Sequence, residues 1–278
     1  ALIAAIGAHG QTIRHQPANG YSIQLNAPHA LAEATGITVI SDFRQRDIAA
    51  GGQGAPLVPV FHASVFNQAR QKGGCIIANI GGMANLTYLP PPGSEARVIG
   101  FDCGPGNVLM DACVEAHTGE RFDRDGNFAA NGTVNAALLA QLLTHEFLAT
   151  KPPKSCGREQ FNLEWIREQA EAHSLSPEDV QATLLAFTAR TLADAVRHHC
   201  GPAVELLVCG GGAHNPQLMQ ALANELPGLK VDTTARYDMD PSIIEAAAFA
   251  WLAQRTLDGL PGNLSAVTGA AGPRILGN

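Results

Sequence analysis

The residues best suited to chemistry lie at 98–107, where an apolar run ends in a carboxylate, Asp102, and a glycine–proline loop follows. A strand that ends here would hold Asp102 at a sheet edge, where functional residues concentrate. Gly104 and Gly106 let backbone N–H groups approach an anion, and a helix that begins near Val108 adds partial positive charge. The turn therefore combines a candidate general base with a phosphate cradle, as phosphoryl transfer requires. The alternative is an acid that only caps the loop.

The triple glycine Gly210, Gly211 and Gly212 is a second candidate, because it follows an expected strand at 204–208 and precedes an expected helix from Pro216. Backbone without side chains can lie against a base or a phosphate, so this order favours nucleotide binding. Tight packing of the helix on the strand explains the same pattern equally well. The chain contains neither GxGxxG nor GxxxxGK[ST], and both explanations stay open.

Two arginines, Arg44 and Arg46, stand in the charged tract 42–47, directly before the glycine-rich residues 51–54. Guanidinium forks suit carboxylate or phosphate oxygens, so these arginines are candidate ligand-binding residues. A surface ion-pair cluster is the default explanation for such a charge run. The adjacent glycines favour a role in binding without deciding it.

Four other polar residues stand out from their surroundings. Glu245 lies in an apolar stretch at 243–252 that indicates a buried helix, so its carboxylate needs a helix end, an arginine or a ligand. Gln11 and Thr12 belong to a polar loop at residues 9–12 and can bind sugar hydroxyls, although ordinary turn chemistry explains them too. Asp111, within the helix expected after Asp102, is interpreted as a solvated or capping acid.

Composition restricts the class of protein. Of 278 residues, 46% are apolar and 15% are charged, which indicates a globular chain and excludes a disordered one. A net charge of −7 without a block of like charges argues against nucleic-acid and membrane partners. Six scattered cysteines, an opening stretch that resembles a strand more than a signal peptide, and the lack of a long apolar run predict a cytoplasmic protein. Histidine and cysteine spacing predicts no protein-ligated metal.

Hydrophobic periodicity predicts an α/β chain with a mixed sheet covered by helices. Strands are expected at 2–8, 21–25, 37–41, 75–80, 83–89, 97–102 and 204–208. Helices are expected at 28–35, 108–117, 133–148 and 177–198, from 216 onward, and from 240 to 252. Gly81 and Gly82 form a tight hairpin turn between two strands, and Ser176 is placed to cap the longest helix.

The motifs of the chain, taken together, resemble those of the anhydro-N-acetylmuramic acid kinases. The resemblance is carried by residues 6–15, 42–59, 79–82, 101–107, 153–159, 209–212 and 268–274. It implies a two-lobed fold of the sugar kinase and actin type (ribonuclease H-like), with ATP and Mg²⁺ in the cleft. Residues 1–72 would be the remainder of the first lobe, with sugar-binding loops, and residues 73–278 the second lobe. The family also has an N-terminal phosphate loop, which would precede residue 1, so the first lobe is expected to be incomplete.

The resemblance further implies an activity. Family members open the 1,6-anhydro ring of the sugar with water while phosphorylating O6, which gives N-acetylmuramic acid 6-phosphate during recycling of cell-wall peptidoglycan. It implies Asp102 as the base, with substrate-binding residues Arg46, Glu245, Gln11 and Thr12. It implies nucleotide-binding residues Gly81, Gly82, Gly104, Gly106, Asn107, Gly210, Gly211 and Gly212. A homodimer is expected, and the alternative function is a catalytically inactive paralogue that only binds the sugar.

Overall fold

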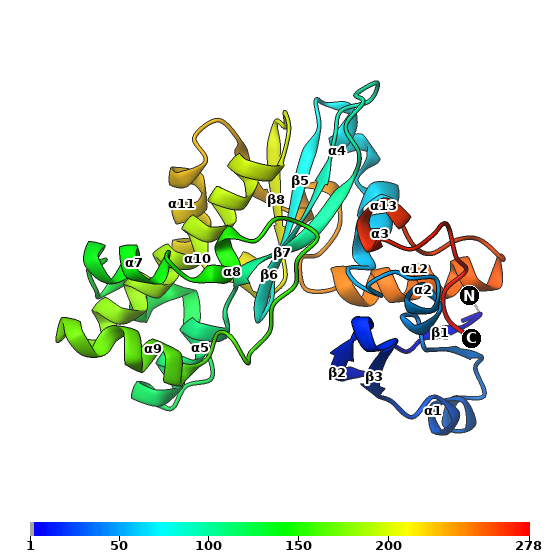
Figure 1. Cartoon of the computed structure of the whole chain (residues 1–278), viewed down its shortest axis with the longest axis horizontal. Helices are drawn as coiled ribbons and strands as arrows, with labels where there is room; N and C mark the ends of the chain where they lie inside the picture. Colours follow the sequence, from blue (N-terminus) through cyan, green and yellow to red (C-terminus); the bar gives the residue numbers. More distant parts are fainter. Residues whose placement is uncertain (1–2) are drawn as a thin grey trace. The chain divides into compact units, whose positions relative to one another are not determined.

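The computed structural model describes residues 3–278, and these residues form two compact units (Figure 1). The first unit runs to Asn67 and also contains Arg97–Ile99 and Ile243–Asn278. The second unit consists of Gln68–Ala96 and Gly100–Ser242. The change of unit at Asn67 lies close to the boundary expected at residue 72. Residues 243–278, expected in the second lobe, instead complete the core of the first unit.

The core of the first unit joins segments from both ends of the chain. Its buried apolar side chains are Ile40, Phe43, Leu57, Phe249, Leu252, Ala253 and Leu276. Its strands are β1 (Ile6–Gly7), β2 (Gln11–Gln16), β3 (Tyr21–Leu25) and β4 (Val39–Ile40), with β1 parallel to β4 and β2 antiparallel to β3. Its helices are α1 (Pro28–Thr35), α2 (Gln45–Ala49), α3 (Val58–Val65), α12 (Ile244–Leu257) and α13 (Ser265–Thr268).

A buried carboxylate, Asp47, ties these distant segments together. It is fully buried and accepts hydrogen bonds from the Gly54 amide (2.8 Å), the Asn263 side-chain amide (2.7 Å) and the Thr268 hydroxyl (2.8 Å). A buried charge is tolerable when several donors satisfy it, as they do here. Asp47 therefore fixes helix α2, which carries Arg46, against the C-terminal segment.

The second unit is built on a five-stranded sheet in the order β7-β6-β5-β8-β9. Its strands are β5 (Cys75–Ile80), β6 (Met83–Leu89), β7 (Ile99–Pro105), β8 (Glu205–Cys209) and β9 (Lys230–Thr233). Strand β5 is antiparallel to β6 and parallel to β8, and β8 is parallel to β9, so the sheet is mixed. This confirms the predicted α/β class.

Helix α10 (Pro177–His199) organises the helical layer of the second unit (Figure 1). Its N-cap residue Ser176 accepts a hydrogen bond from the Asp179 amide at 3.1 Å, as the sequence predicts. It packs against several of the remaining helices of the unit. The helices of the second unit other than α10 are α4 (Asn67–Gln71, whose first residue belongs to the first unit), α5 (Val108–Thr118), α6 (Asn127–Ala130), α7 (Ala136–Leu142), α8 (Glu146–Ala149), α9 (Leu163–Ala170) and α11 (Pro216–Glu225).

Two expected helices differ from the observed ones because local caps intervene. The helix expected at 133–148 is divided into α7 and α8, since the His145 ring accepts a hydrogen bond from the Phe147 amide and starts a new helix. The helix expected from residue 240 begins at Ile244, since the Asp240 carboxylate accepts from the Ser242 amide and holds a turn there.

The strands expected near the N-terminus differ as well. Strand β1 covers only Ile6–Gly7 of the expected 2–8, and residue 2 lies outside the described residues. The expected polar loop at 9–12 already enters strand β2 at Gln11. Strand β7, expected at 97–102, covers Ile99–Pro105 and so carries Asp102 within the strand.

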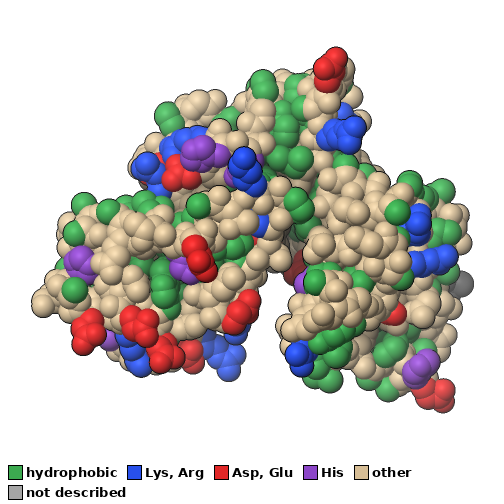
Figure 2. Space-filling view, in the orientation of Figure 1, with side chains coloured by type: hydrophobic (Ala, Val, Ile, Leu, Met, Phe, Trp, Pro, Cys, Tyr) green, Lys and Arg blue, Asp and Glu red, His purple; other side chains and the backbone are tan. Residues whose placement is uncertain are grey.

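The surface carries both signs of charge. Figure 2 shows Lys and Arg side chains interspersed with Asp and Glu on the visible face. Across residues 3–278, none of the helices combines the length and the apolar character needed to cross a bilayer.

Replacement of Asp47 tests its structural role. We expect Asp47→Ala to lower the free energy of unfolding by about 3 kcal/mol, because three buried donors lose their acceptor. Urea denaturation measures this change. Asp258→Ala, at an exposed position just after α12 in the same unit, serves as the control and should change stability by less than about 0.5 kcal/mol. Equal stabilities of the two variants would contradict the role of Asp47.

Candidate functional site

The turn after β7 is bound to the tip of the β5–β6 hairpin. The amides of Gly106 and Val108 donate to the Gly82 carbonyl at 2.9 and 3.1 Å, and the Asn107 amide donates to the Gly81 carbonyl at 2.8 Å. The Asn107 side-chain amide also donates to the Ile80 carbonyl at 3.0 Å. Four of the expected nucleotide-binding residues thus lie together. The turn amides, however, hold the hairpin, whereas they were expected to face an anion.

This junction leaves no room for a side chain at Gly106. A Cβ atom there would lie 2.4 Å from the Gly81 carbonyl oxygen, far inside van der Waals contact. Gly104 has a φ of +142°, in the region that favours glycine, so its contribution is conformational. Both glycines therefore shape the turn.

The triple glycine packs against the end of β5. A Cβ on Gly210 would lie 2.5 Å from Asn79 Oδ1, and one on Gly212 would lie 2.5 Å from Ile80 Cγ2, so both positions need glycine for close packing. Gly211 differs, because a Cβ there would lie 3.3 Å from the Asn107 side-chain nitrogen. Gly210 and Gly212 thus agree with the packing explanation, while Gly211 faces Asn107.

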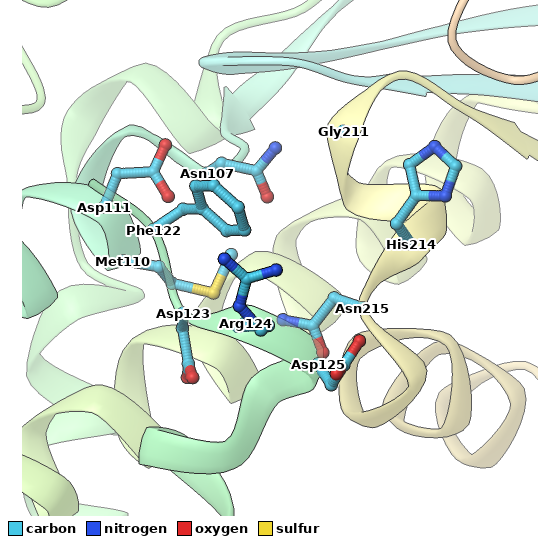
Figure 3. Close-up of a pocket in the computed structure, with 10 residues that line it drawn as sticks. All are labelled: Asn107, Met110, Asp111, Phe122, Asp123, Arg124, Asp125, Gly211, His214 and Asn215. Carbon is cyan, nitrogen blue, oxygen red and sulfur yellow. The ribbon is translucent and has the colours of Figure 1, made fainter. Parts of the chain in front are cut away.

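Gly211 and Asn107 border a cavity of about 470 Å³ within the second unit (Figure 3). Its volume lies in the range of small-molecule sites. It is lined by Asn107, Met110, Asp111, Phe122, Asp123, Arg124, Asp125, Gly211, His214 and Asn215. The cavity lies between the loop after β7, the loop after β8 and a third segment, residues 122–125. The sequence predicted no site residue in this third segment.

An aromatic–cation pair forms part of this third segment. Phe122 is 53% exposed, and the Arg124 guanidinium lies 5.5 Å from its ring centroid. The neighbouring Asp123 carboxylate is buried and accepts from the amides of Phe128 (2.8 Å) and Ala129 (2.9 Å), which fixes the segment. An exposed ring beside a cation suits stacking on a flat heterocycle. The signal in the sequence was an aromatic residue inside a charged run ahead of Gly126.

Asp111, interpreted above as a solvated or capping acid, lies in the first turn of α5 and also lines the cavity. Burial raises its pKa to about 6, while the Arg158 guanidinium acts in the opposite direction. A half-buried carboxyl that titrates close to neutral pH is typical of functional sites.

Asp102 is half-buried and held at two points by a neighbouring segment. Its amide donates to the Lys154 carbonyl at 3.1 Å, and its Oδ2 accepts from the Cys156 amide at 3.0 Å. These bonds fix both the strand and the carboxylate. A carboxylate with a fixed orientation can act as a general base when its target lies within hydrogen-bond reach.

In the first unit, three of the four expected sugar-binding residues lie on neighbouring elements. Gln11 and Thr12 begin strand β2, and the Thr12 hydroxyl accepts from the Gln24 side chain at 3.2 Å. Arg46 is exposed on α2, whose Gln45 donates to the Ser22 carbonyl of β3 at 3.1 Å. The β2–β3 hairpin and α2 are therefore in contact.

The fourth residue, Glu245, is exposed in the first turn of α12. The expectation that this helix is buried nearly all round is wrong, because α12 buries one stripe that includes Phe249 and leaves Glu245 and Ala246 exposed. Glu245 lies one helical turn before Phe249.

His9 connects α12 to the arginine tract, a role that the sequence did not reveal. Its ring stacks on Phe249 with centroids 4.3 Å apart, and its Nε2 accepts from Arg44 Nε at 2.9 Å. Because arginine can only donate, His9 carries its proton on Nδ1, which donates to the Gly10 carbonyl at 2.7 Å. Burial and the charge of Arg44 lower the pKa of His9 to about 4.

Comparison of the sequence with known proteins identifies the family of the chain. The family model described as anhydro-N-acetylmuramic acid kinase matches residues 1–278. The chain belongs to this family. A relative named anhydro-N-acetylmuramic acid kinase, from Thiobacillus denitrificans, is 57% identical over 279 residues, which cover all of this chain and 74% of that protein. Another of the same name, from Pseudomonas savastanoi pv. phaseolicola, is 54% identical over 278 residues, which cover all of this chain and 75% of that protein.

The chain also aligns with a solved structure. The activator of the 2-hydroxyisocaproyl-CoA dehydratase from Clostridium difficile with bound ADPNP aligns with a TM-score of 0.47 and 15% sequence identity. The alignment covers 91% of this chain and 97% of that one.

A side chain at position 106 should disrupt the junction of this kinase-family chain. We expect Gly106→Ala to lower the free energy of unfolding by about 2 kcal/mol, because the added methyl group meets backbone that cannot rotate away. Denaturation in urea gives this value. Gly228→Ala, where an added Cβ meets nothing within 4 Å, is the matched control. If both variants unfold at the same urea concentration, the close approach at Gly106 is not restrictive.

The pKa of His9 predicts a pH-dependent contribution to stability. Between about pH 6.5 and pH 4 the unfolded chain protonates this ring while the folded chain does not, so the contribution of neutral His9 is present above pH 6.5 and is lost as the pH falls. The stability difference between wild type and His9→Gln should therefore shrink on acidification from pH 7 to pH 5. Urea denaturation at both pH values measures it, with His117→Gln, at the exposed end of α5, as control. A difference independent of pH would refute the assignment.

Proposed function

We propose that this chain uses ATP to hydrolyse the 1,6-anhydro bond of 1,6-anhydro-N-acetylmuramic acid and to phosphorylate O6, giving N-acetylmuramic acid 6-phosphate. Membership of the kinase family supports the reaction class. The observation that carries the proposal is the pair of hydrogen bonds that holds Asp102, one at its backbone amide and one at its carboxylate. Asp102 lies on the strand that leads into the turn packed on the Gly81–Gly82 hairpin.

In this mechanism Asp102 accepts a proton from water. The water oxygen forms a bond to the anomeric carbon, and the bond from that carbon to O6 breaks. O6 then takes the γ-phosphoryl group of ATP, and ADP leaves. The proton from water remains on Asp102 until it passes to solvent, so the overall products are the 6-phosphate, ADP and one proton.

The cavity of the second unit is assigned to the nucleotide. Phe122 and Arg124 offer a stacking surface for the base, and Asn107 and Gly211 border the same space. The hairpin tip at Gly81 and Gly82 is assigned to the phosphates. Of the remaining glycines of the two loops, Gly106, Gly210 and Gly212 act by allowing close packing, and Gly104 acts through its backbone conformation.

The donor set fits Mg²⁺ bound mainly through ATP. Within the described residues no group of three or more acidic, histidine or cysteine side chains could hold a metal ion. Mg²⁺ at kinase sites usually keeps several waters and needs only one or two carboxylates beside the phosphates. Asp111 offers such a carboxylate at the cavity wall. When bound, the ion would neutralise phosphate charge.

The sugar is assigned to Arg46, Glu245, Gln11 and Thr12 of the first unit. The exposed Arg46 guanidinium suits the carboxylate that muramic acid carries, while Gln11 and Thr12 suit hydroxyl and amide groups. The proposal includes a homodimer, and it places the reaction in peptidoglycan recycling in the cytoplasm. Membership of the family supports these assignments.

Asp102→Asn tests the mechanism. We expect kcat with the anhydro sugar and ATP to fall by about 10²- to 10⁴-fold, because the amide cannot accept the proton from water, while the affinity for ATP stays unchanged. A coupled assay for ADP release and calorimetric titration give the two quantities. The control is Asp258→Asn, at the exposed end of α12.

Two results would count against the proposal. Equal turnover of wild type and Asp102→Asn would end the assignment of Asp102 as base. Sugar binding by the wild type without turnover or nucleotide binding would favour the sugar-binding paralogue.

A further inference from the structure

The segment 152–158 contains a motif to which the proposed function gives no role. Two of its backbone groups contact Asp102, through the Lys154 carbonyl and the Cys156 amide. Whatever fixes this segment therefore fixes the carboxylate. The contact at Cys156 reaches Oδ2 directly, so a displacement of the segment would turn the carboxylate as well as shift the strand.

The Lys154 side chain anchors the segment to helix α8. Its ammonium donates to the carbonyls of Phe147 and Leu148, each at 3.3 Å, and lies 4.6 Å from the centroid of the Phe147 ring. A cation at the carbonyl end of a helix is favourable, and the aromatic face adds a cation–π attraction. Three contacts thus converge on one half-buried ammonium group.

A second cavity, of about 260 Å³, lies beside this anchor. Its walls include Cys103, the neighbour of Asp102 on β7, together with Lys154 and Thr191. Open space next to the segment means that packing alone does not hold it in place. Loss of the ammonium contacts would therefore leave the segment free to shift into this space.

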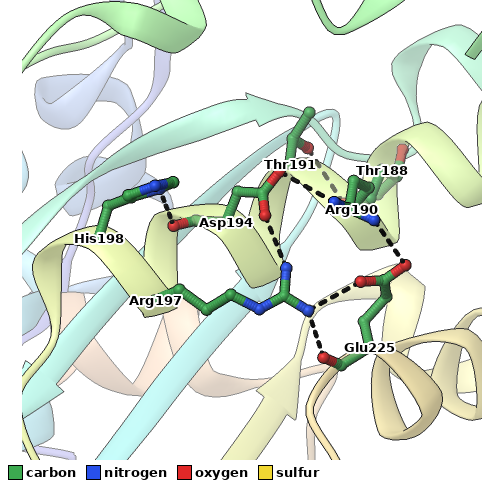
Figure 4. A network of polar contacts seen from close by, with 7 residues as sticks. All are labelled: Thr188, Arg190, Thr191, Asp194, Arg197, His198 and Glu225. Carbon is green, nitrogen blue, oxygen red and sulfur yellow. Dashed lines mark hydrogen bonds and ion pairs between the residues drawn. The ribbon is translucent and has the colours of Figure 1, made fainter. Parts of the chain in front are cut away.

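Asp194 borders the same cavity but is engaged elsewhere. Its carboxylate accepts from Arg190 Nε at 3.1 Å and from an Arg197 terminal nitrogen at 2.6 Å, and both arginines also contact Glu225 (Figure 4). This network belongs to the outer face of α10 and stabilises α10 against α11. Asp194 therefore does not pair with Lys154, whereas the Lys154 ammonium interacts electrostatically with Cys103, Cys156 and Asp102.

We propose that Lys154 is a positioning residue for Asp102, holding segment 152–158 against α8 so that the Cys156 amide orients the carboxylate. The inference rests on the proposed function of Asp102 as the base. It gives a role to segment 152–158, which contributes to the family resemblance and contacts no assigned ligand.

Because Lys154 is charged, its proposed role also predicts an effect on the pH dependence of the rate. The titratable groups around it are Asp102 and Cys103 of β7, Cys156 of its own segment, and Asp194, His198 and His199 of α10. Burial lowers the pKa of Lys154, while Cys103, Cys156 and Asp102 act in the opposite direction. Removing the cation takes away an interaction that favours ionised Asp102, so the acid limb of the pH–rate profile should move to higher pH.

Lys154→Met is the test, with Lys154→Arg as the conservative variant and Lys151→Met as the matched control. Lys151 belongs to the same loop and is exposed. We expect Lys154→Met to lower kcat by about 10- to 100-fold at unchanged KM for ATP, because a misplaced base loses alignment. The acid limb should move to higher pH. Lys154→Arg should recover most of kcat and the original pH profile, and Lys151→Met should match the wild type.

Hydrogen exchange of Asp102 and of residues 152–158 gives a readout independent of turnover. The Asp102 and Cys156 amides should exchange faster in Lys154→Met than in the wild type or Lys151→Met. If Lys154→Met does not fold, Lys154→Gln, which keeps a neutral donor, replaces it with the same expectations. Wild-type kcat, pH profile and exchange rates in the neutral variant would overturn the inference. A wild-type chain without turnover but with the expected exchange pattern would overturn the proposed function alone.

Discussion

Three consecutive backbone amides bonded to two hairpin carbonyls form the junction on which the candidate site of the second unit depends. Gly106, Asn107 and Val108 donate to Gly81 and Gly82, and this fixes where β7 ends and where α5 begins. The strand end in turn places Asp102, while the helix start places Asn107 and Asp111 at the cavity wall. Most of these bonds are made by backbone, and the Asn107 side chain adds one to the Ile80 carbonyl.

In the first unit, side chains hold the elements together. Asp47, on α2, accepts hydrogen bonds from the loop after this helix and from the C-terminal segment, so elements far apart in sequence hold one another. The His9 ring, stacked on Phe249 and bonded to Arg44, joins the β1–β2 turn to the same framework. In the proposed function, the exposed Arg46 and Glu245 belong to this fixed framework, which would reduce the entropy lost when the sugar binds.

Local signals in the sequence predicted much of this structure. The alternation and the glycine turn at 75–89 predicted both strands of the hairpin, and the cap at Ser176 predicted the start of α10. The assignments of Asp102 and the glycine loops stay predictions. The sequence could not show that Phe122, Asp111 and His214 line one cavity, because three separate segments meet there. Nor could it show that His145 would divide a helix whose apolar spacing was continuous.

The division into two units also orders the events of synthesis. Gln68–Ala96 and Gly100–Ser242 make up the second unit, so every residue it needs has been translated before residue 243. The first unit depends on Phe249, Leu252 and Leu276 for its core, and these residues are translated only after the whole of the second unit. Ile40, Phe43 and Leu57 therefore lack these partners of their core cluster until residues 249–276 have been translated. Apolar surface that is exposed during synthesis in this way is prone to aggregate.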